Sequence, residues 1–352
     1  MKSWYAITAL SLILATSCGK KDSTTDVDTD DTTETAAPTP TPCADIDCGP
    51  HGRCEELDGQ ATCDCDEGYV AESLQCVDLD ECATDNGGCG SDIRFLCENQ
   101  EAQAPICTDK CADLGAHIEE NPNAANFPPM AGTVWYSTEI IIESDPSSFV
   151  DLSYAGQGER VMFDRRTASW ITENAHLFPA DFGGGVEVEI QVNPEFSREE
   201  AEVEARFYAK SIGKIPAFLF RDIQTVWIHR GVELYGGGNN NLLIHTGQTP
   251  EYVRDGVLEE VFIHEAAHTS MDAYHAAATE WLAAQAADGI AISDYAQEHP
   301  NREDIAETLG PYLAYRHRRD RLNNRQIKMV KNNIPNRVLF FECLELGMDL
   351  LE

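Results

Sequence analysis

Cysteine is the residue that most constrains the fold of this chain of 352 residues, because eleven of its 13 cysteines lie between Cys43 and Cys111. In an exported protein such a density indicates a framework of disulfide bonds. The cysteines stop before Phe127, and the apolar content of the rest predicts a larger globular domain over residues 127–352. Only Cys18 and Cys343 lie outside the cysteine-rich segment.

The N-terminus predicts export. Residues 1–17 contain a basic residue, an apolar run from Trp4 to Ala15 and small residues before Cys18, which is the pattern of a secretory signal too short to span a membrane. The ending LATSC resembles a bacterial lipobox, and this implies removal of the signal and lipid modification of Cys18. An ordinary signal peptide with a nearby cysteine is the alternative. Because Gly19 rather than an aspartate follows, the sorting rule of enteric bacteria implies anchoring at the outer membrane, on its periplasmic or its outer side.

Residues 18–42 contain no aromatic residue and almost nothing apolar, so they are expected to form a disordered acidic Thr/Pro tether. The whole chain has 61 acidic residues against 25 Lys and Arg, a formal net charge of −36. A protein that binds nucleic acid needs a basic surface, so this balance argues against a nucleic-acid partner. The membrane is expected to be a partner only through the N-terminal lipid.

The first six cysteines follow the spacing C-x4-C-x5-C-x8-C-x-C-x10-C, with Gly68 and Tyr69 between the last two. Residues 43–77 thereby resemble an EGF-like module, although a different small disulfide knot stays open. Spacing alone leaves 15 pairings. The resemblance implies three of them: Cys43–Cys54, Cys48–Cys63 and Cys65–Cys76.

Residues 78–126 begin like a second, calcium-binding EGF module, in which Asp78, Asp80 and Glu81 occupy the positions of calcium ligands. The C-x-C pair of that family is missing, so the region is expected to be a degenerate module. An acidic linker between modules would explain the same three acids without Ca²⁺. Its five cysteines are an odd number, which predicts that Cys343 pairs with one of them.

The globular domain is expected to be α+β. Alternating apolar and polar residues predict a half-buried strand within 183–194, and an acidic first turn after Ser197 predicts a helix that runs to Gly213. The triple glycine at 236–238 lacks the residues of a phosphate loop and is not assigned to one. The strand at 242–245 is either an edge on which a peptide lies extended or an interior strand. Further strands are expected at 133–136, 139–142 and 225–231.

The run VFIHEAAHTSMDAYH contains an H-E-x-x-H motif on a helix expected over 256–273. Residues four apart lie on one face of a helix, so His264 and His268 suit two ligand positions of a tetrahedral zinc site. Glu265 then lies where it can take a proton from a water at the metal and deliver it to a leaving amine. Two structural histidines without metal are the alternative.

The third ligand distinguishes the classes of zinc site. On an unbroken helix His275 would lie about 16 Å along the axis from His264, too far for one metal ion. Asp272 lies one turn beyond His268 and can accept a hydrogen bond from its imidazole; as a direct ligand it would need a bend there. A later helix, expected to be capped by Asn301, carries two further carboxylates one turn apart.

These carboxylates lie in the run Glu303-Asp304-Ile305-Ala306-Glu307, which resembles the E-x-x-A-E of the anthrax lethal factor catalytic domain and related gluzincins. The resemblance implies that Glu303 binds zinc and that Glu307 supports a ligand histidine. Two alternatives stay open: Glu307 binds zinc in place of Glu303, or both acids lie on a solvated helix face and bind no metal. The same resemblance has a further implication. It also implies that Tyr295 lies near the substrate carbonyl and steadies the oxyanion; a packed aromatic residue is the alternative.

The wider run after residue 128 resembles a group of uncharacterised exported bacterial proteins classed as metallopeptidases. This implies a zincin-like domain, with a mixed sheet, an active-site helix and a crossing glutamate helix, that hydrolyses peptide bonds at the cell envelope. The alternative function is a non-catalytic surface protein that binds a protein partner through the EGF-like region. The basic run 316–333 is expected to be a helix face paired with the acidic body, or else a contact with an anionic envelope surface.

Overall fold

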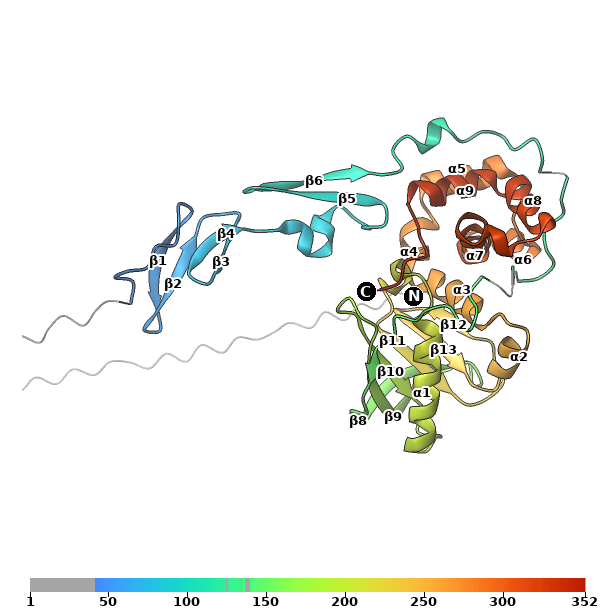
Figure 1. Ribbon diagram of the computed structural model, residues 1–352, viewed down its shortest axis with the longest axis horizontal. Helices are drawn as coiled ribbons and strands as arrows, with labels where there is room; N and C mark the ends of the chain where they lie inside the picture. The colour runs from blue at the N-terminus through green and yellow to red at the C-terminus, as the bar shows by residue number, and fades with distance from the viewer. Residues whose placement is uncertain (1–41, 125, 134, 137–139, 352) are drawn as a thin grey trace, which may run out of the picture. The chain divides into compact units, whose positions relative to one another are not determined.

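A computed structural model describes residues 42–124, 126–133, 135–136 and 140–351 (Figure 1). The predicted signal at 1–17, the lipidation site Cys18 and the predicted tether up to residue 41 lie outside the described residues. The chain forms two compact units. Of the described residues, the first contains those from Pro42 to Asp66 together with Ala71–Cys76, and the second contains Glu67–Val70 and those from Val77 to Leu351.

The first unit consists largely of a hairpin of β1 (Gly52–Leu57) and β2 (Gln60–Cys65), and it is followed by a second hairpin of β3 (Tyr69–Glu72) and β4 (Gln75–Asp78). Short hairpins bury little apolar surface, so cross-links must supply much of the stability. The disulfides join the cysteines that the EGF resemblance implies: Cys43–Cys54, Cys48–Cys63 and Cys65–Cys76.

A second cysteine-rich segment opens the second unit. Two short 3₁₀ turns, Glu81–Ala83 and Asp85–Gly88, precede a hairpin of β5 (Phe95–Gln100) and β6 (Gln103–Asp109). Two disulfides hold the turns to the hairpin: Cys82–Cys97 and Cys89–Cys107.

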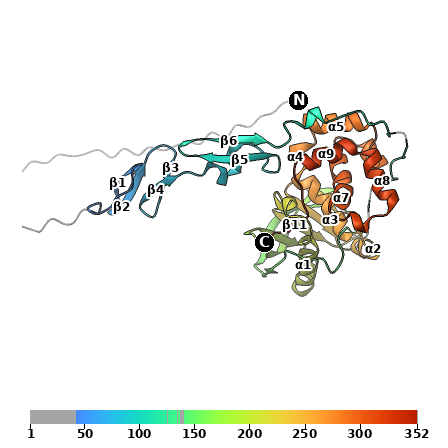
Figure 2. The same cartoon turned by 45° about the horizontal axis from the view of Figure 1, so that its top comes forward.

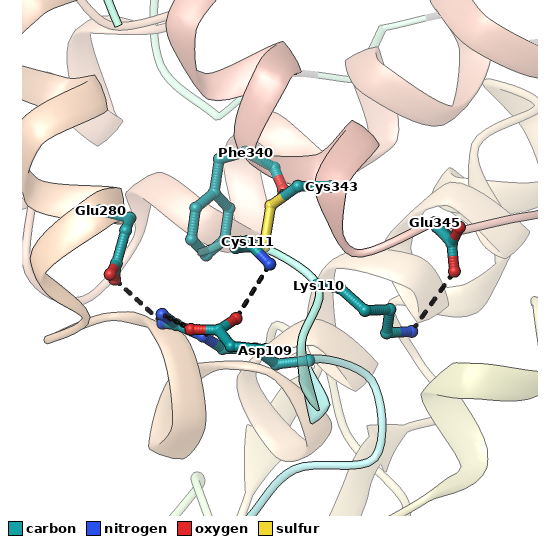
Figure 3. Close-up of a disulfide and its surroundings, with 8 residues drawn as sticks. Asp109, Lys110, Cys111, Glu280, Phe340, Cys343 and Glu345 are labelled. Carbon is teal, nitrogen blue, oxygen red and sulfur yellow. Dashed lines mark hydrogen bonds and ion pairs between the residues drawn. A yellow bond between two sulfur atoms is a disulfide. The ribbon is translucent and has the colours of Figure 1, made fainter. Parts of the chain in front are cut away.

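The fifth cysteine of this segment, Cys111, pairs with Cys343 at the end of α9 (Pro335–Cys343), 232 residues away (Figure 3). The prediction that Cys343 pairs with one of the five is therefore confirmed. Beside the disulfide, Lys110 lies 3.7 Å from Glu345. Arg94 forms ion pairs with Asp109, two residues before Cys111, at 2.7 Å and with Glu280 at 2.9 Å.

The centre of the second unit is a mixed sheet of seven strands. The three strands β13, β11 and β10 are parallel, and the other pairings are antiparallel. In spatial order the strands are β12 (Gly236–Gly238), β13 (Asn241–His245), β11 (Thr225–His229), β10 (Glu187–Val192), β9 (Ser169–Asp181) and β7 (Asp151–Leu152), and β8 (Gly156–Asp164) also pairs with β9.

The strands expected at 183–194, 225–231 and 242–245 are confirmed, and 242–245 is interior, between β12 and β11. The strands expected at 133–136 and 139–142 are wrong, because none of the described positions in these ranges is in a strand. The long hairpin of β8 and β9 was not predicted, because apolar residues such as Val161 and Trp170 lie on its exposed side and break the alternation of apolar and polar residues.

The two faces of the sheet are unequal. The face that carries Val226 and Leu242 packs in the main core with α1 (Arg198–Ile212) and α3 (Leu258–Ser270). The predicted helix after Ser197 is confirmed as α1, and Ser197 forms a capping box with Glu200. The opposite face carries a small separate cluster: Met162, Ala175, Leu177, Trp227 and Leu243.

The helix expected over 256–273 is interrupted at both ends. Gly256 has a positive φ of 68° and ends the preceding α2 (Thr249–Arg254), so α3 begins only at Leu258. At Met271 φ is −118°, which separates α3 from α4 (Asp272–His275). The boundaries differ from the prediction because the apolar pattern runs across both breaks.

The remaining helices lie on the side of α3 away from the sheet, so that α3 lies between the sheet and α7 (Figures 1 and 2). Asn301 is not the N-cap of α7, because the carbonyl of His299 accepts hydrogen bonds from the amides of Arg302 and Glu303 and forms a turn first. These helices are α5 (Thr279–Asp288), α6 (Asp294–Glu298), α7 (Asp304–His317), α8 (Asn324–Asn333) and α9.

A buried ionic group fixes the start of α7. Arg337 on α9 donates to Asp304 at 2.7 Å and to Asp288, the last residue of α5, at 3.0 Å. The three side chains are at most 4% exposed. An ion pair with little access to water is broken only at a cost of several kcal/mol, so α5, α7 and α9 are held in one arrangement.

We predict that the Cys111→Ser, Cys343→Ser double variant loses about 2–5 kcal/mol of the free energy of unfolding, because the disulfide closes a very long loop and restricts the unfolded chain. Urea unfolding of the full chain measures this loss. The control, Glu345→Gln, removes only the exposed ion pair beside it and is expected to cost less than about 1 kcal/mol. Equal unfolding midpoints for the double variant and the unmodified chain would contradict the prediction.

Candidate metal centre

His264 and His268 lie one turn apart on α3 and point to the same side of it, as their spacing dictates. Their Nε2 atoms are 3.2 Å apart, and both rings are shielded from water, with side-chain exposures of 9% and 15%. The ring of Trp135 packs edge-on against His264 at 5.8 Å. Two imidazole nitrogens are thereby presented to one point inside the protein.

Glu303 brings a carboxylate to the same point from the residue that precedes α7, the helix that packs against α3. Its Oε2 lies 3.6 Å from Nε2 of His264 and 3.2 Å from Nε2 of His268. Within the described part of the chain these three residues are the one group whose geometry could hold a metal ion. Neighbouring ligands of a tetrahedral zinc ion, with bonds of about 2.0–2.1 Å, are about 3.3–3.4 Å apart, so the donor set fits zinc.

Each imidazole has a carboxylate at its other nitrogen. Asp272, just beyond the break at Met271, lies 2.7 Å from Nδ1 of His268. Glu307, in the first turn of α7, lies 3.8 Å from Nδ1 of His264 and accepts a hydrogen bond from Ser293 at 2.7 Å. Carboxylates at Nδ1 favour the tautomer that leaves the lone pair on Nε2, which is the atom a metal ion requires.

The electrostatics of the site favour a cation. Burial alone would lower the pKa of His268, but hydrogen bonds to Asp272 and Glu303 raise it to about 10. Burial also opposes ionisation of Glu303, yet hydrogen bonds from His264 and His268 hold its pKa well below the usual range. The negative potential that retains a proton on His268 would also stabilise a metal cation bound by Nε2.

The second oxygen of Glu303 is held by two residues that contribute no ligand atom. The hydroxyl of Tyr295 donates to Oε1 at 3.1 Å, and Nε of Arg302 donates to it at 2.8 Å. Arg302 also donates to the Tyr295 hydroxyl at 3.2 Å. Ser293, the N-cap of α6, fixes the helix that carries Tyr295. Sequence reasoning missed Arg302 and Ser293, although Arg302 directly precedes the expected ligand.

The three potential ligands line a cavity of about 640 Å³. Glu265, Asp272 and Tyr295 line the same cavity, so the predicted general base opens onto the space that a substrate would occupy. Further lining residues come from the turn between β8 and β9, from β12 and the segment before it, and from α2: Arg165, Leu234, Gly237, Gly238, Glu251 and Tyr252.

The triple glycine forms β12, the edge strand of the sheet, and not a loop. A Cβ on Gly237 would lie 1.8 Å from the carbonyl oxygen of Glu265, so only glycine allows the strand to approach α3 so closely. Thr269 fixes the contact, because its hydroxyl bonds to the Glu265 carbonyl and accepts from the amide of Gly238. Of the two readings of 242–245, the interior strand is correct, and β12 is the edge beside the cavity.

His275 is not brought to the site. It is fully buried at the end of α4, packs edge-on against Phe340 at 5.8 Å, and neither of its ring nitrogens has a hydrogen-bond partner within the described residues. Burial, with the positive charges of Arg94 and Arg221, lowers its pKa to about 4. His275 is therefore a neutral core residue.

The residues expected to bind calcium have other partners. Asp78 accepts hydrogen bonds from the side chain of Asn99 and the amide of Ala102, and Asp80 caps the 3₁₀ turn through the amide of Cys82. Glu81 begins that turn. A calcium ion would have to replace these donors, and Ca²⁺ binding stays a prediction.

In the basic run 316–333, Arg321 pairs with Asp145 at 2.9 Å and Arg316 lies 3.7 Å from Glu342. These two side chains agree with the first interpretation, in which the basic run pairs with acidic residues of the domain.

Comparison with known proteins adds no relative: no family model matches the chain, and no curated protein and no solved structure is similar to it. None of the helices in the described residues is long and apolar enough to cross a membrane. The site must therefore be interpreted from its own geometry.

We predict that Gly237→Ala lowers the free energy of unfolding by about 1–3 kcal/mol, because the new methyl group must push β12 away from the backbone of α3. Urea unfolding measures the loss. Gly236→Ala is the matched control: its Cβ would meet only the end of the Arg165 side chain, which can move, so the expected cost is smaller. A Gly237→Ala variant as stable as the unmodified chain would show that the strand does not lie against Glu265.

Two buried histidines make the folded chain less stable in acid. Burial lowers the pKa of His275 and of His229 to about 4, so the unfolded chain binds more protons than the folded chain between about pH 6.5 and pH 4. Stability therefore falls as the pH falls through this range, by about 3 kcal/mol for each histidine. We expect His275→Phe to lose about 3 kcal/mol less between pH 7 and pH 4 in urea unfolding. The exposed control His117→Gln should behave like the unmodified chain, and an equal acid loss in His275→Phe would contradict the assignment.

Proposed function

We propose that the chain is an exported zinc metallopeptidase of gluzincin type, in which His264, His268 and Glu303 hold the metal. The main support is the set of distances between the three donor atoms, 3.2, 3.2 and 3.6 Å, which are close to the distances between ligand atoms of a tetrahedral zinc ion. Zinc bound there would supply a Lewis acid that polarises a carbonyl and lowers the pKa of water. A zincin-like fold agrees with the edge strand beside a two-histidine helix.

Glu265 is the general base and acid in this proposal. Glu265 lies between the two ligand histidines in the sequence, and it lines the cavity. A carboxylate in this position takes a proton from the attacking water and then delivers it to the nitrogen that leaves, so that one residue serves both halves of peptide hydrolysis.

Tyr295 and Glu307 support the reaction in different ways. The Tyr295 hydroxyl already donates to Glu303 at the rim of the cavity, so it is within reach of a substrate carbonyl and is assigned to steady the developing oxyanion. Glu307 and Asp272 orient the two imidazoles, because each carboxylate faces the Nδ1 atom of one ligand histidine.

The substrate is a peptide in extended conformation. β12 is an edge strand and borders the cavity with Gly237 and Gly238, so its outer edge can pair with an added strand. Backbone pairing would hold a peptide independently of its sequence and would place one of its peptide bonds next to Glu265.

The remaining parts of the chain agree with work at a cell envelope. Lipid-modified Cys18 would anchor the protein at the outer membrane, with residues 18–42 as the tether. The disulfide-bonded EGF-like region would act as a spacer or bind a protein partner, with Ca²⁺ at Asp78, Asp80 and Glu81. All six described disulfides suit an oxidising compartment.

Elemental analysis of the purified full chain tests the metal site. We predict one zinc ion per chain, a large loss of zinc in Glu303→Ala, and about 10–100-fold weaker binding in Asp272→Ala, which removes only the acceptor behind His268. Glu265→Gln should retain zinc but lose about 10²–10⁴-fold in the cleavage of a peptide library. Glu202→Gln, a half-buried substitution on α1 at a residue that does not line the cavity, is the matched control and should change neither quantity.

Two results would contradict the proposal. A folded chain that binds no zinc would leave the cysteine-rich binding protein as the better interpretation. A chain that binds zinc while the unmodified protein and Glu265→Gln cleave the library equally would make the metal structural.

A further inference from the structure

A second cavity of about 290 Å³ lies behind the edge strand, on the side of the sheet away from α3. Three aromatic side chains line it: Phe163 and Trp170 from the β8–β9 hairpin, and Trp227 from β11. The ring of Trp170 packs edge-on against both of the others at 5.5 Å and is itself 55% exposed. A large exposed indole over a hollow is a feature of ligand sites and not of an ordinary sheet surface.

The cavity and the metal centre lie on the two sides of β12 and share lining residues from it. Gly237 and Gly238 line both cavities, because strand residues without side chains leave both faces of the edge open. The pairing Gly237↔Leu242 and Gly236↔Leu243 shows the alternation: Leu242 belongs to the core beneath α3, and Leu243 to the cluster with Trp227. A peptide added to β12 must alternate in the same way. A side chain on the metal face is therefore flanked by side chains that face the aromatic cavity.

Arg165 lies at the junction, because it too lines both cavities. Its guanidinium lies over Gly236, where a Cβ would be 2.7 Å from Nη2. Arg165 is exposed, and no carboxylate of the described residues lies within ion-pair distance of it, although acids outnumber Lys and Arg in this chain by 61 to 25. Its neighbour Arg166, in contrast, pairs with Asp164 and Glu195. A guanidinium that has no carboxylate partner among the described residues, and that lines both cavities, is suited to bind a carboxylate of a ligand.

We propose that Trp170 and Arg165 determine substrate specificity: the aromatic cavity binds an aromatic side chain, and Arg165 binds a carboxylate, of a peptide paired with β12. This inference rests on the peptide-hydrolysing function proposed above and names its substrate class. The preferred substrates are extended segments that combine an aromatic residue, next to the residue on the metal face, with an acidic residue nearby.

The test separates recognition from catalysis. The full chain carrying Glu265→Gln is immobilised, a pool of random decapeptides is passed over it, and the retained peptides are sequenced by mass spectrometry. We expect Phe, Tyr or Trp and Asp or Glu to be enriched at least about threefold over the input. Adding Trp170→Ala should abolish only the aromatic enrichment, and adding Arg165→Ala only the acidic enrichment.

Two matched controls accompany these variants. Val161→Ala truncates an exposed apolar residue of β8, the strand that pairs with β9, and Arg198→Ala removes an exposed arginine that contacts Tyr154 and lines neither cavity. Neither should alter the enrichment. Enrichment that survives Trp170→Ala and Arg165→Ala, enrichment without aromatic or acidic residues, or no retention by the folded protein would overturn the inference. Zinc content is measured on the same preparations, and cleavage of the peptide library is measured on the unmodified chain beside Glu265→Gln. Both stay as proposed above if only the specificity is wrong, and both fail if the proposed function itself is wrong.

Discussion

The crossing of α3 and α7 is the constraint on which the rest of the structure depends. α3 supplies two imidazoles and Glu303, the residue directly before α7, supplies the carboxylate, so the three donor atoms meet only if the helices keep one relative position. The buried group of Arg337, Asp288 and Asp304 fixes the start of α7 next to Glu303. Because these charges have no access to water, any shift of α7 would leave one of them unpaired, and the site inherits that rigidity.

The edge strand is the complementary constraint on the other side of α3. Gly237 lies against the backbone of Glu265, so the edge strand proposed to pair with a peptide and the residue proposed to transfer the proton are fixed to each other. The same absence of side chains opens β12 to the aromatic cavity behind it. One short glycine run thus connects the reaction site with the residues proposed to select the substrate.

The parts that sequence reasoning predicted are those set by local spacing. The H-E-x-x-H motif places two imidazoles on one helical face, and the disulfide pairs of the first module agree with the family pattern. Most of the residues that it missed act through contacts that spacing does not show. Ser293 matters because a turn brings α6 beside α7, and the role of Gly237 depends on a strand packing against a helix distant in sequence. Arg302 is next to Glu303 in the chain, but the sequence does not show that its side chain turns back onto that carboxylate. Helix ends at Gly256 and Met271 were missed because the apolar pattern continues through them.

Anomalous diffraction at the zinc absorption edge, recorded from crystals of the full chain purified with its metal, tests the central claim most directly. The account predicts one strong anomalous peak within about 2.0–2.2 Å of Nε2 of His264, Nε2 of His268 and a carboxylate oxygen of Glu303. A peak bound instead by Asp272, Glu307 or His275, or the absence of any peak at the two histidines, would contradict it.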